Sequence, residues 1–131
     1  MSQELTMLAY SVGLLFILVL VQAFSGIASV GLQPLADSRD GLPPATGFHA
    51  RAGRCVDNHR EGLTLFAPLI LIAAVSHVSS STTILGAQLF FFGRLAHAAL
   101  YLAGVPKVRP LAWAVGIVGT VMVFAALMGW R

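Results

Sequence analysis

The chain has 131 residues, of which 57% are hydrophobic and 10% are charged, and its formal net charge is +3. Soluble domains carry roughly 25% charged residues, so this composition excludes an ordinary soluble domain. The single cysteine, Cys55, excludes an internal disulfide framework. The basic residues do not form a soluble stripe with interleaved aromatic residues, and we therefore expect no nucleic-acid partner.

Four segments are close to the roughly 20 predominantly apolar residues that a membrane-spanning helix needs. Open sheet edges are not stable in hydrocarbon, so these segments are predicted to be helices rather than strands. The sequence therefore predicts an all-α fold, an integral membrane four-helix bundle that occupies residues 1–131 as a single domain. The predicted helices lie at about residues 5–32, 51–80, 82–104 and 109–130.

The first predicted helix, residues 5–32, contains no charged residue. The residues at its start, MSQE, include an acid where a cleaved signal peptide has positive charge, and the apolar run is longer than in such a peptide. We therefore expect this helix to be retained. The segment that follows, residues 33–49, is rich in Pro, Gly and Asp and is predicted to be an irregular loop.

The second predicted helix, residues 51–80, begins with a polar stripe. Arg51, Arg54, Asn58 and Glu61 fall within roughly 80° of one another around an α-helix. One interpretation is structural, because an arginine at a helix start often extends to the membrane interface and an Arg–Glu pair can hold two helices in register. The number of hydrogen-bonding groups on one face favours a binding site instead.

The third predicted helix, residues 82–104, has a second polar stripe formed by Arg94, His97 and Tyr101. A charge at the centre of a bilayer costs about 2.5–3.5 kcal/mol even on a lenient insertion scale. We therefore expect the two stripes to face each other, a neighbouring subunit or a water-filled cavity.

The connections show a charge asymmetry that predicts orientation. Basic residues lie in or beside the 33–49 and 105–109 connections, whereas the segment SHVSSSTT between the second and third helices has none. Positively charged loops stay on the cytoplasmic side, so the 33–49 and 105–109 connections are predicted to be cytoplasmic. The fourth helix then returns the chain to the opposite side.

The remaining polar residues point to no further site. His49, His59 and His77 share no metal-ligand spacing, so we expect no metal site. Cys55 has no activating base at a suitable spacing, and the better interpretation is a packed side chain.

The pattern R-x-x-R-x-x-x-N-x-x-E from Arg51 to Glu61, followed by Phe66, resembles the signature of the MAPEG family, membrane-associated proteins in eicosanoid and glutathione metabolism. A second stretch, FGRLAHAALYLAGVPKVRPLAW, resembles the third helix and following turn of the prostaglandin-synthase branch of that family. The resemblance extends over the whole chain in helix number, order and loop length. The chain is most similar to the compact bacterial members, which implies a bacterial inner membrane.

The resemblance implies a homotrimer that binds glutathione, as co-substrate, between adjacent subunits near the cytoplasmic side. The residues that match the family's glutathione site are Arg51, Arg54, Asn58, Glu61, Arg94, His97 and Tyr101. Arg109 matches the catalytic arginine that stabilises the glutathione thiolate.

The chemistry of glutathione fits these residue types. Glutathione carries two carboxylates and one ammonium group, and arginine provides forked donors suited to carboxylates. Glu61 suits the ammonium group. A thiol is a poor nucleophile until it ionises, and a neighbouring guanidinium lowers its pKa. The sequence thus predicts a membrane-bound glutathione transferase or peroxidase that acts on a lipophilic electrophile.

Two other functions remain open from the sequence. One is a non-catalytic membrane protein that binds a lipid or lipophilic small molecule in the same fold, as in the lipoxygenase-activating branch of the family. The other is a small transporter or channel. Both polar stripes end about halfway along their helices, so a continuous pore is not expected.

Overall fold

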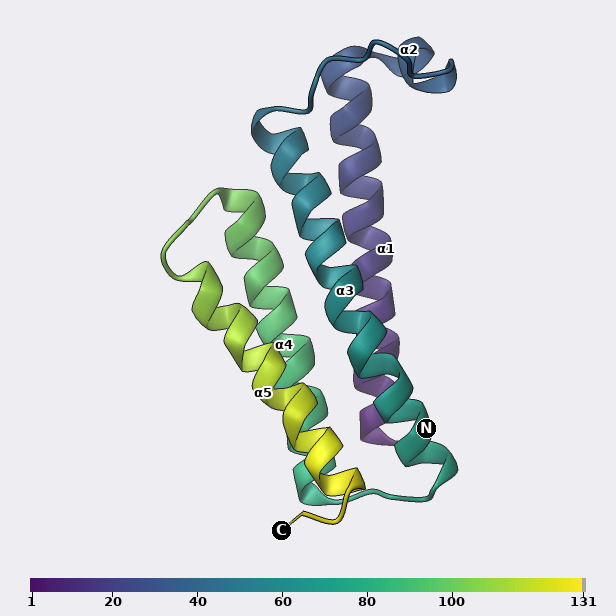
Figure 1. Cartoon of the computed structure of the whole chain (residues 1–131), viewed down its shortest axis with the longest axis vertical. Helices are drawn as coiled ribbons and strands as arrows, with labels where there is room; N and C mark the ends of the chain where they lie inside the picture. Colours follow the sequence, from purple (N-terminus) through teal and green to yellow (C-terminus); the bar gives the residue numbers. More distant parts are fainter. Residues whose placement is uncertain (131) are drawn as a thin grey trace.

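A computed structural model describes residues 1–130, and the predicted domain's last residue, Arg131, lies outside this range. The described residues form five α-helices and no strand (Figure 1). The helices are α1 (Gln3–Val30), α2 (Leu32–Ala36), α3 (Gly47–Val75), α4 (Ser81–Ala103) and α5 (Arg109–Leu127).

Three of these helices, α1, α4 and α5, are long and apolar enough to cross a membrane. The sequence predicted a fourth span within residues 51–80, which α3 covers in part. Helix α3 is 29 residues long, but its first half carries the polar stripe. Its composition is therefore too polar for a candidate membrane span. Among residues 1–130, the structure thus has three candidate spans rather than four.

The end of α3 differs from its predicted position. The sequence predicted that this helix ends at residue 80, whereas it ends at Val75. His77 then adopts a left-handed conformation with φ of 55°. Ser80 caps α4, since its hydroxyl accepts from the backbone N–H of Thr83 at 3.2 Å while the Thr83 hydroxyl accepts from the Ser80 N–H at 2.8 Å. Serine favours such caps over helix interiors, so the serine-rich segment separates the helices.

The segment predicted as an irregular loop, residues 33–49, contains helical structure at both ends. The short helix α2 follows α1 directly, and α3 begins at Gly47, four residues earlier than predicted. Gly31, with φ of 87°, makes the bend between α1 and α2. Residues with a side chain rarely adopt this conformation, so the position of the bend follows from the glycine.

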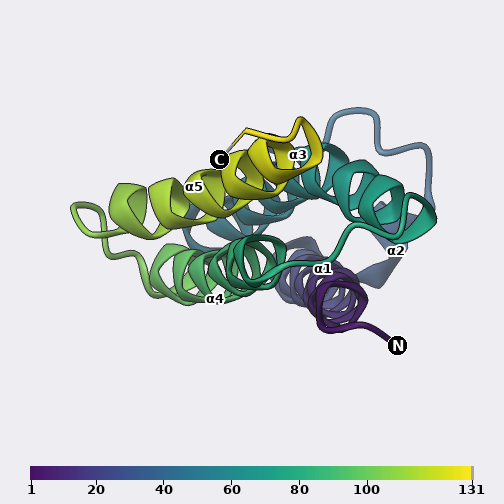
Figure 2. The same ribbon diagram turned by 90° about the horizontal axis from the view of Figure 1, so that it is seen from below.

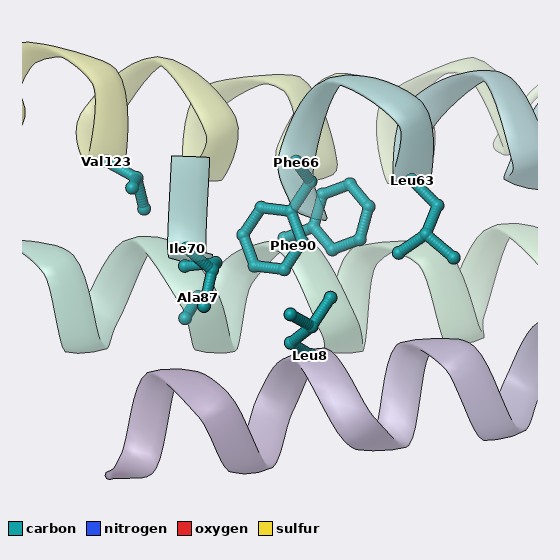
Figure 3. Packing of buried hydrophobic residues seen from close by; sticks show 7 residues of the cluster. All are labelled: Leu8, Leu63, Phe66, Ile70, Ala87, Phe90 and Val123. Carbon is teal, nitrogen blue, oxygen red and sulfur yellow. The ribbon is translucent and has the colours of Figure 1, made fainter. Parts of the chain in front are cut away.

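An apolar core fills the half of the molecule that is farthest from α2. Phe66 of α3 and Phe90 of α4 are buried and stack with their ring centroids 3.8 Å apart. The side chains around this pair come from all four long helices (Figure 3), and they are Leu8, Leu63, Ile70, Ala87 and Val123. We call this half the apolar half.

Helices α4 and α5 pack closely along their length (Figures 1 and 2). Glycines permit this approach, because a Cβ added at Gly86 would lie 2.8 Å from the carbonyl oxygen of Gly119. A Cβ at Gly93 would lie equally close to the backbone nitrogen of Gly116. In lipid, helices associate through this kind of small-residue contact. The contact also fixes the start of α5, and with it Arg109, beside the end of α4.

Candidate functional site

Helix α3 begins, α4 ends and α5 begins toward the same end of the molecule (Figure 1), and the predicted site residues lie between this end and the middle of α3 and α4. We call them the polar cluster. Its members are Arg51, Arg54, Asn58 and Glu61 of α3, Arg94, His97 and Tyr101 of α4, and Arg109 at the start of α5.

Arg94 joins the two stripes at the inner edge of the polar cluster. Its side chain is 2% exposed. One guanidinium nitrogen donates to Asn58 Oδ1 at 2.9 Å and another donates to the Asn58 backbone carbonyl. Arg94 Nε is buried and has no hydrogen-bond partner among the described residues. The stripes therefore meet between α3 and α4, and Arg94 fixes the orientation of the Asn58 amide.

Two glycines make room for this arginine. A Cβ added at Gly62 of α3 would collide with the Arg94 guanidinium and would lie 2.6 Å from its Cζ. A Cβ added at Gly116 of α5 would lie 3.0 Å from Arg94 Cδ. Sequence reasoning missed both residues, although a glycine inside a helix costs stability and is a signal for a close contact.

Tyr101 connects three other members of the polar cluster. Arg54 Nε donates to the Tyr101 hydroxyl at 3.3 Å. The Arg109 guanidinium carbon lies 4.2 Å from the centre of the Tyr101 ring, and the His97 ring packs edge-on at 5.4 Å. Arginine above an aromatic face is an attractive arrangement. Tyr101 therefore brings the side chains of α3 and α5 to the last turn of α4.

Arg51 and Glu61 are placed differently from the other members. Arg51 Nε donates to the Leu102 backbone carbonyl at 3.4 Å, where a cation stabilises the end of α4. Glu61 is exposed and forms no hydrogen bond or ion pair with any residue in the described range. Arg51 thus ties α3 to α4, whereas Glu61 leaves its carboxylate at the surface of this chain.

The polar cluster carries four guanidinium groups against one carboxylate, that of Glu61. The other acid nearby, Asp57, is paired with Arg60 at 2.6 Å, and both side chains are exposed. Asp57 therefore does not compensate the polar cluster. This excess of positive charge suits an anionic ligand, and arginine is well matched to carboxylates.

Two buried polar residues of α3 serve packing. Cys55 is fully buried and packs with apolar residues of α1 and α4. The His59 ring nitrogen Nε2 lies 2.9 Å from the Ser11 backbone oxygen and joins α3 to α1. Among residues 1–130, no group of three or more His, Cys, Asp or Glu side chains could hold a metal ion.

A cavity of about 550 Å³ lies at the same end of the molecule, between α1, α2 and the start of α3. Its wall is mostly apolar, with Gln22, Arg39 and His49 as its polar members. The polar cluster lies outside this cavity. Two members of the polar cluster, Arg54 and Glu61, are instead exposed at the surface of the chain.

The family model described as MAPEG family matches residues 5–129. No curated protein and no solved structure matches the chain.

Proposed function

The chain belongs to the MAPEG family, and from this premise we propose that it is a membrane-bound, glutathione-dependent transferase or peroxidase. Membership of the family supports membrane-associated, glutathione-related transferase or isomerase chemistry in general. The observation that carries the proposal is the excess of arginine in the polar cluster, which contains four guanidinium groups and one carboxylate.

The polar cluster has the donors that glutathione needs as co-substrate. Arg54 is exposed and can present its free guanidinium nitrogens to a glutathione carboxylate. Asn58 Oδ1 accepts from Arg94, which fixes the orientation of the side-chain amide. The Asn58 Nδ2 group can then donate to glutathione. Glu61 accepts from the glutathione ammonium group. In this proposal Arg94 is a positioning residue, and Arg51 and His97 complete the binding site.

Arg109 is the proposed catalytic residue. Its guanidinium rests on the Tyr101 ring at the first turn of α5, where the partial positive charge of the helix N-terminus also favours an anion. A thiol placed there gives its proton to water, since the cation lowers the pKa of the thiol and stabilises the thiolate. The same contact holds the guanidinium in place before glutathione binds.

The thiolate then attacks an electrophile that enters from the lipid. With an aryl halide, the carbon–sulfur bond forms and the halide leaves with the bonding electrons. With a lipid hydroperoxide, sulfur attacks the terminal oxygen, the O–O bond breaks and the alkoxide takes a proton to give an alcohol. A second glutathione then reduces the resulting sulfenic acid to water and glutathione disulfide.

We further propose that four-helix subunits assemble as a homotrimer. Arg54 and Glu61 are exposed in a single chain, and a neighbouring subunit would enclose glutathione on that side. Large apolar side chains are exposed along α1 and α5 and suit contacts with lipid or another subunit. In this assembly the 33–49 and 105–109 connections face the cytoplasm of a bacterial inner membrane.

Replacing Arg109 tests the proposed chemistry. In Arg109→Ala, turnover of an activated aryl chloride with glutathione at pH 7 should fall roughly 100-fold, a typical cost of losing one group that stabilises a developing anion. Without the cation the thiol pKa rises, so the lost rate should return in part as the pH is raised. Lys107→Ala is the matched control, because it removes an exposed cation from the same connection, and its rate should stay within twofold of the wild type.

A pH profile of Arg109→Ala that coincides with the wild-type profile would contradict the role of Arg109. The competing function, a non-catalytic protein that binds lipid, is distinguished by calorimetry in detergent. Such a protein should release heat with a lipid and none with glutathione.

A further inference from the structure

Arg51 makes contacts with the protein that set it apart from the other arginines of the polar cluster. Its Nε donates to the backbone carbonyl of Leu102, near the end of α4, at 3.4 Å. Its guanidinium also lies against Gly104, since a Cβ added at this glycine would be 3.6 Å from both Nε and Cζ of Arg51. On its own helix, Arg51 Cζ lies 5.8 Å from the centre of the Phe48 ring. The end of α4 and Phe48 thus hold the head of this side chain.

The contact completes the C-terminal cap of α4. Gly104 follows the helix in a left-handed conformation, with φ of 76°. Its N–H and the next N–H along the chain donate to the carbonyls of Tyr101 and Leu100, at 3.1 and 2.9 Å. The carbonyl of Leu102 accepts instead from Arg51. A helix leaves its last four carbonyls without partners of its own, so α3 supplies a donor that α4 lacks.

Hydrogen bonds join α3 and α4 at three successive levels. From the middle of the helices outward, the levels are Asn58 with Arg94, Arg54 with Tyr101, and Arg51 with Leu102. The middle level depends on an exposed arginine, which water can also reach. The outermost level ends on the backbone of α4, so it fixes the position of the helix and not only that of one side chain.

In the proposed site, glutathione would contact residues on both sides of these levels. Arg54, Asn58 and Glu61 of α3 take the charged ends of the tripeptide, whereas Arg109 of α5 meets the sulfur. Helix α5 is fixed to α4, because their backbones touch at paired glycines. The spacing of α3 and α4 at the outermost level therefore sets how far the sulfur lies from the Arg109 guanidinium.

We propose, on the basis of the proposed function, that Arg51 is a positioning residue: by holding the end of α4 to α3, it places Arg109 at the glutathione sulfur. In this role Arg51 completes the binding site by shaping it and not by touching glutathione. A misplacement of about 1 Å can cost about 100-fold in rate. Loss of the Arg51 contact should therefore impair thiolate formation and leave the affinity for the tripeptide intact.

Arg51→Lys tests this role, because it keeps the cation but has a methylene where arginine has the Nε–H group. S-methylglutathione has the carboxylates and the ammonium group but no thiol, and its affinity is measured by calorimetry in detergent. The thiolate of bound glutathione is measured by its ultraviolet absorbance at saturation, at the pH where half of the wild-type thiol is ionised. Arg51→Lys should bind S-methylglutathione within twofold of the wild type and form about tenfold less thiolate.

The same substitution at an exposed arginine, Arg39→Lys, is the matched control and should change neither quantity. If Arg51 instead binds a glutathione carboxylate, Arg51→Lys should weaken S-methylglutathione binding at least as much as it reduces the thiolate. That result would overturn the proposal, as would an unchanged thiolate fraction in Arg51→Lys.

Gly104→Ala reaches the same contact without changing a charged group, and it decides the outcome if Arg51→Lys does not fold. Alanine is strained at φ of 76°, so the end of α4 must shift. The thiolate fraction should fall while S-methylglutathione affinity stays within twofold of the wild type. The double variant should lose little more thiolate than the more impaired single variant, because both changes act on one contact. Fully additive losses would overturn the proposal.

Amide hydrogen exchange of the ligand-free protein separates a failure of this proposal from a failure of the proposed function. The N–H groups of Gly104 and Val105 close the end of α4, and they should exchange about tenfold faster in Arg51→Lys than in Arg39→Lys. Equal exchange would overturn the proposal even if glutathione binds. A wild type that binds neither glutathione nor S-methylglutathione would overturn the proposed function and the catalytic part of this proposal with it, while faster exchange would still show that Arg51 holds α4 to α3.

Discussion

The two halves of α3 and α4 have opposite designs. In the apolar half, Phe66 and Phe90 stack and their neighbours fill the space around them. In the half that carries the polar cluster, Arg94 is buried with an unpaired nitrogen, and Glu61 is exposed and unpaired among the described residues. The Phe66–Phe90 cluster is packed within one chain, whereas the polar cluster leaves charge that a ligand can neutralise. The apolar half therefore holds the helices together, and the polar cluster is available for binding.

Glycine serves a different purpose in each half. Gly86 and Gly119 bring the backbones of α4 and α5 together, because each approaches the other's carbonyl group. Gly62 instead makes room for the Arg94 side chain. The α4–α5 pair therefore uses small residues for packing, and the polar cluster uses Gly62 and Gly116 to accommodate a buried cation.

The largest expected effect on stability is in the apolar half. Phe66→Ala should lower the free energy of unfolding by about 3 kcal/mol, which is near the low end for a buried phenylalanine. The loss is at the low end because the hydrophobic effect contributes little to contacts between helices in lipid. Denaturation in detergent measures the loss. Glutathione affinity of the folded protein should stay within twofold of the wild type, and a large loss of affinity at unchanged stability would break the distinction between the halves.

Gly62→Ala should destabilise the protein by about 2 kcal/mol, because the added Cβ overlaps a guanidinium that Asn58 holds in place. Gly13→Ala is the matched control on α1, since a Cβ there meets nothing within 4 Å. The control should be neutral or slightly stabilising. Equal melting temperatures of the two variants would show that Gly62 does not position Arg94.

Arg94→Met should show the reverse of the Phe66 result. Replacing a desolvated charge by an apolar chain should change stability by about 1 kcal/mol or less. Glutathione affinity, measured by calorimetry, should fall about tenfold because the Asn58 amide loses the donor that orients it. If Arg94→Met lowers the free energy of unfolding by several kcal/mol but leaves the glutathione affinity of the folded protein unchanged, Arg94 belongs with the packing residues.

The smallest expected effect is at Tyr101. Tyr101→Phe removes the hydroxyl that accepts from Arg54 and keeps the ring beneath Arg109. The dissociation constant for glutathione should rise about fivefold, which corresponds to about 1 kcal/mol for one hydrogen bond. Tyr10→Phe, a change on the exposed face of α1, should have no effect on binding. Equal effects of the two variants would remove the Arg54–Tyr101 hydrogen bond from the binding site.

The sequence predicted that the two polar stripes face each other, a neighbouring subunit or a water-filled cavity, and hydrogen bonds from Arg94 to Asn58 and from Arg54 to Tyr101 join the stripes to each other. This was predictable because helical periodicity fixes the face of each side chain and because charges avoid lipid. The contact of Arg51 with the Leu102 carbonyl was not predictable. It depends on where α4 ends, at the left-handed Gly104, and on the crossing of α3 beside it.

Features that depend on tertiary contacts escaped the sequence analysis. The hydrogen bond of Glu4 to Thr83 joins residues that are 79 positions apart. Gly62 acquires its role from the rotation of α4, which periodicity within α3 does not reveal. The apolar run ends at Val75, where α3 also ends, but the prediction extended the helix through the polar segment to residue 80. The turn is set by the local backbone conformation at His77.

Titration calorimetry of glutathione into the detergent-solubilised protein tests most directly whether the polar cluster is a ligand site. The wild type should give a saturable heat, and Arg54→Gln should weaken the affinity about tenfold by removing a charged donor. Arg39→Gln, which removes an exposed arginine from the connection between α1 and α3, should bind as the wild type does. Absence of a saturable heat in the wild type, or the same loss in Arg39→Gln, would contradict the assignment.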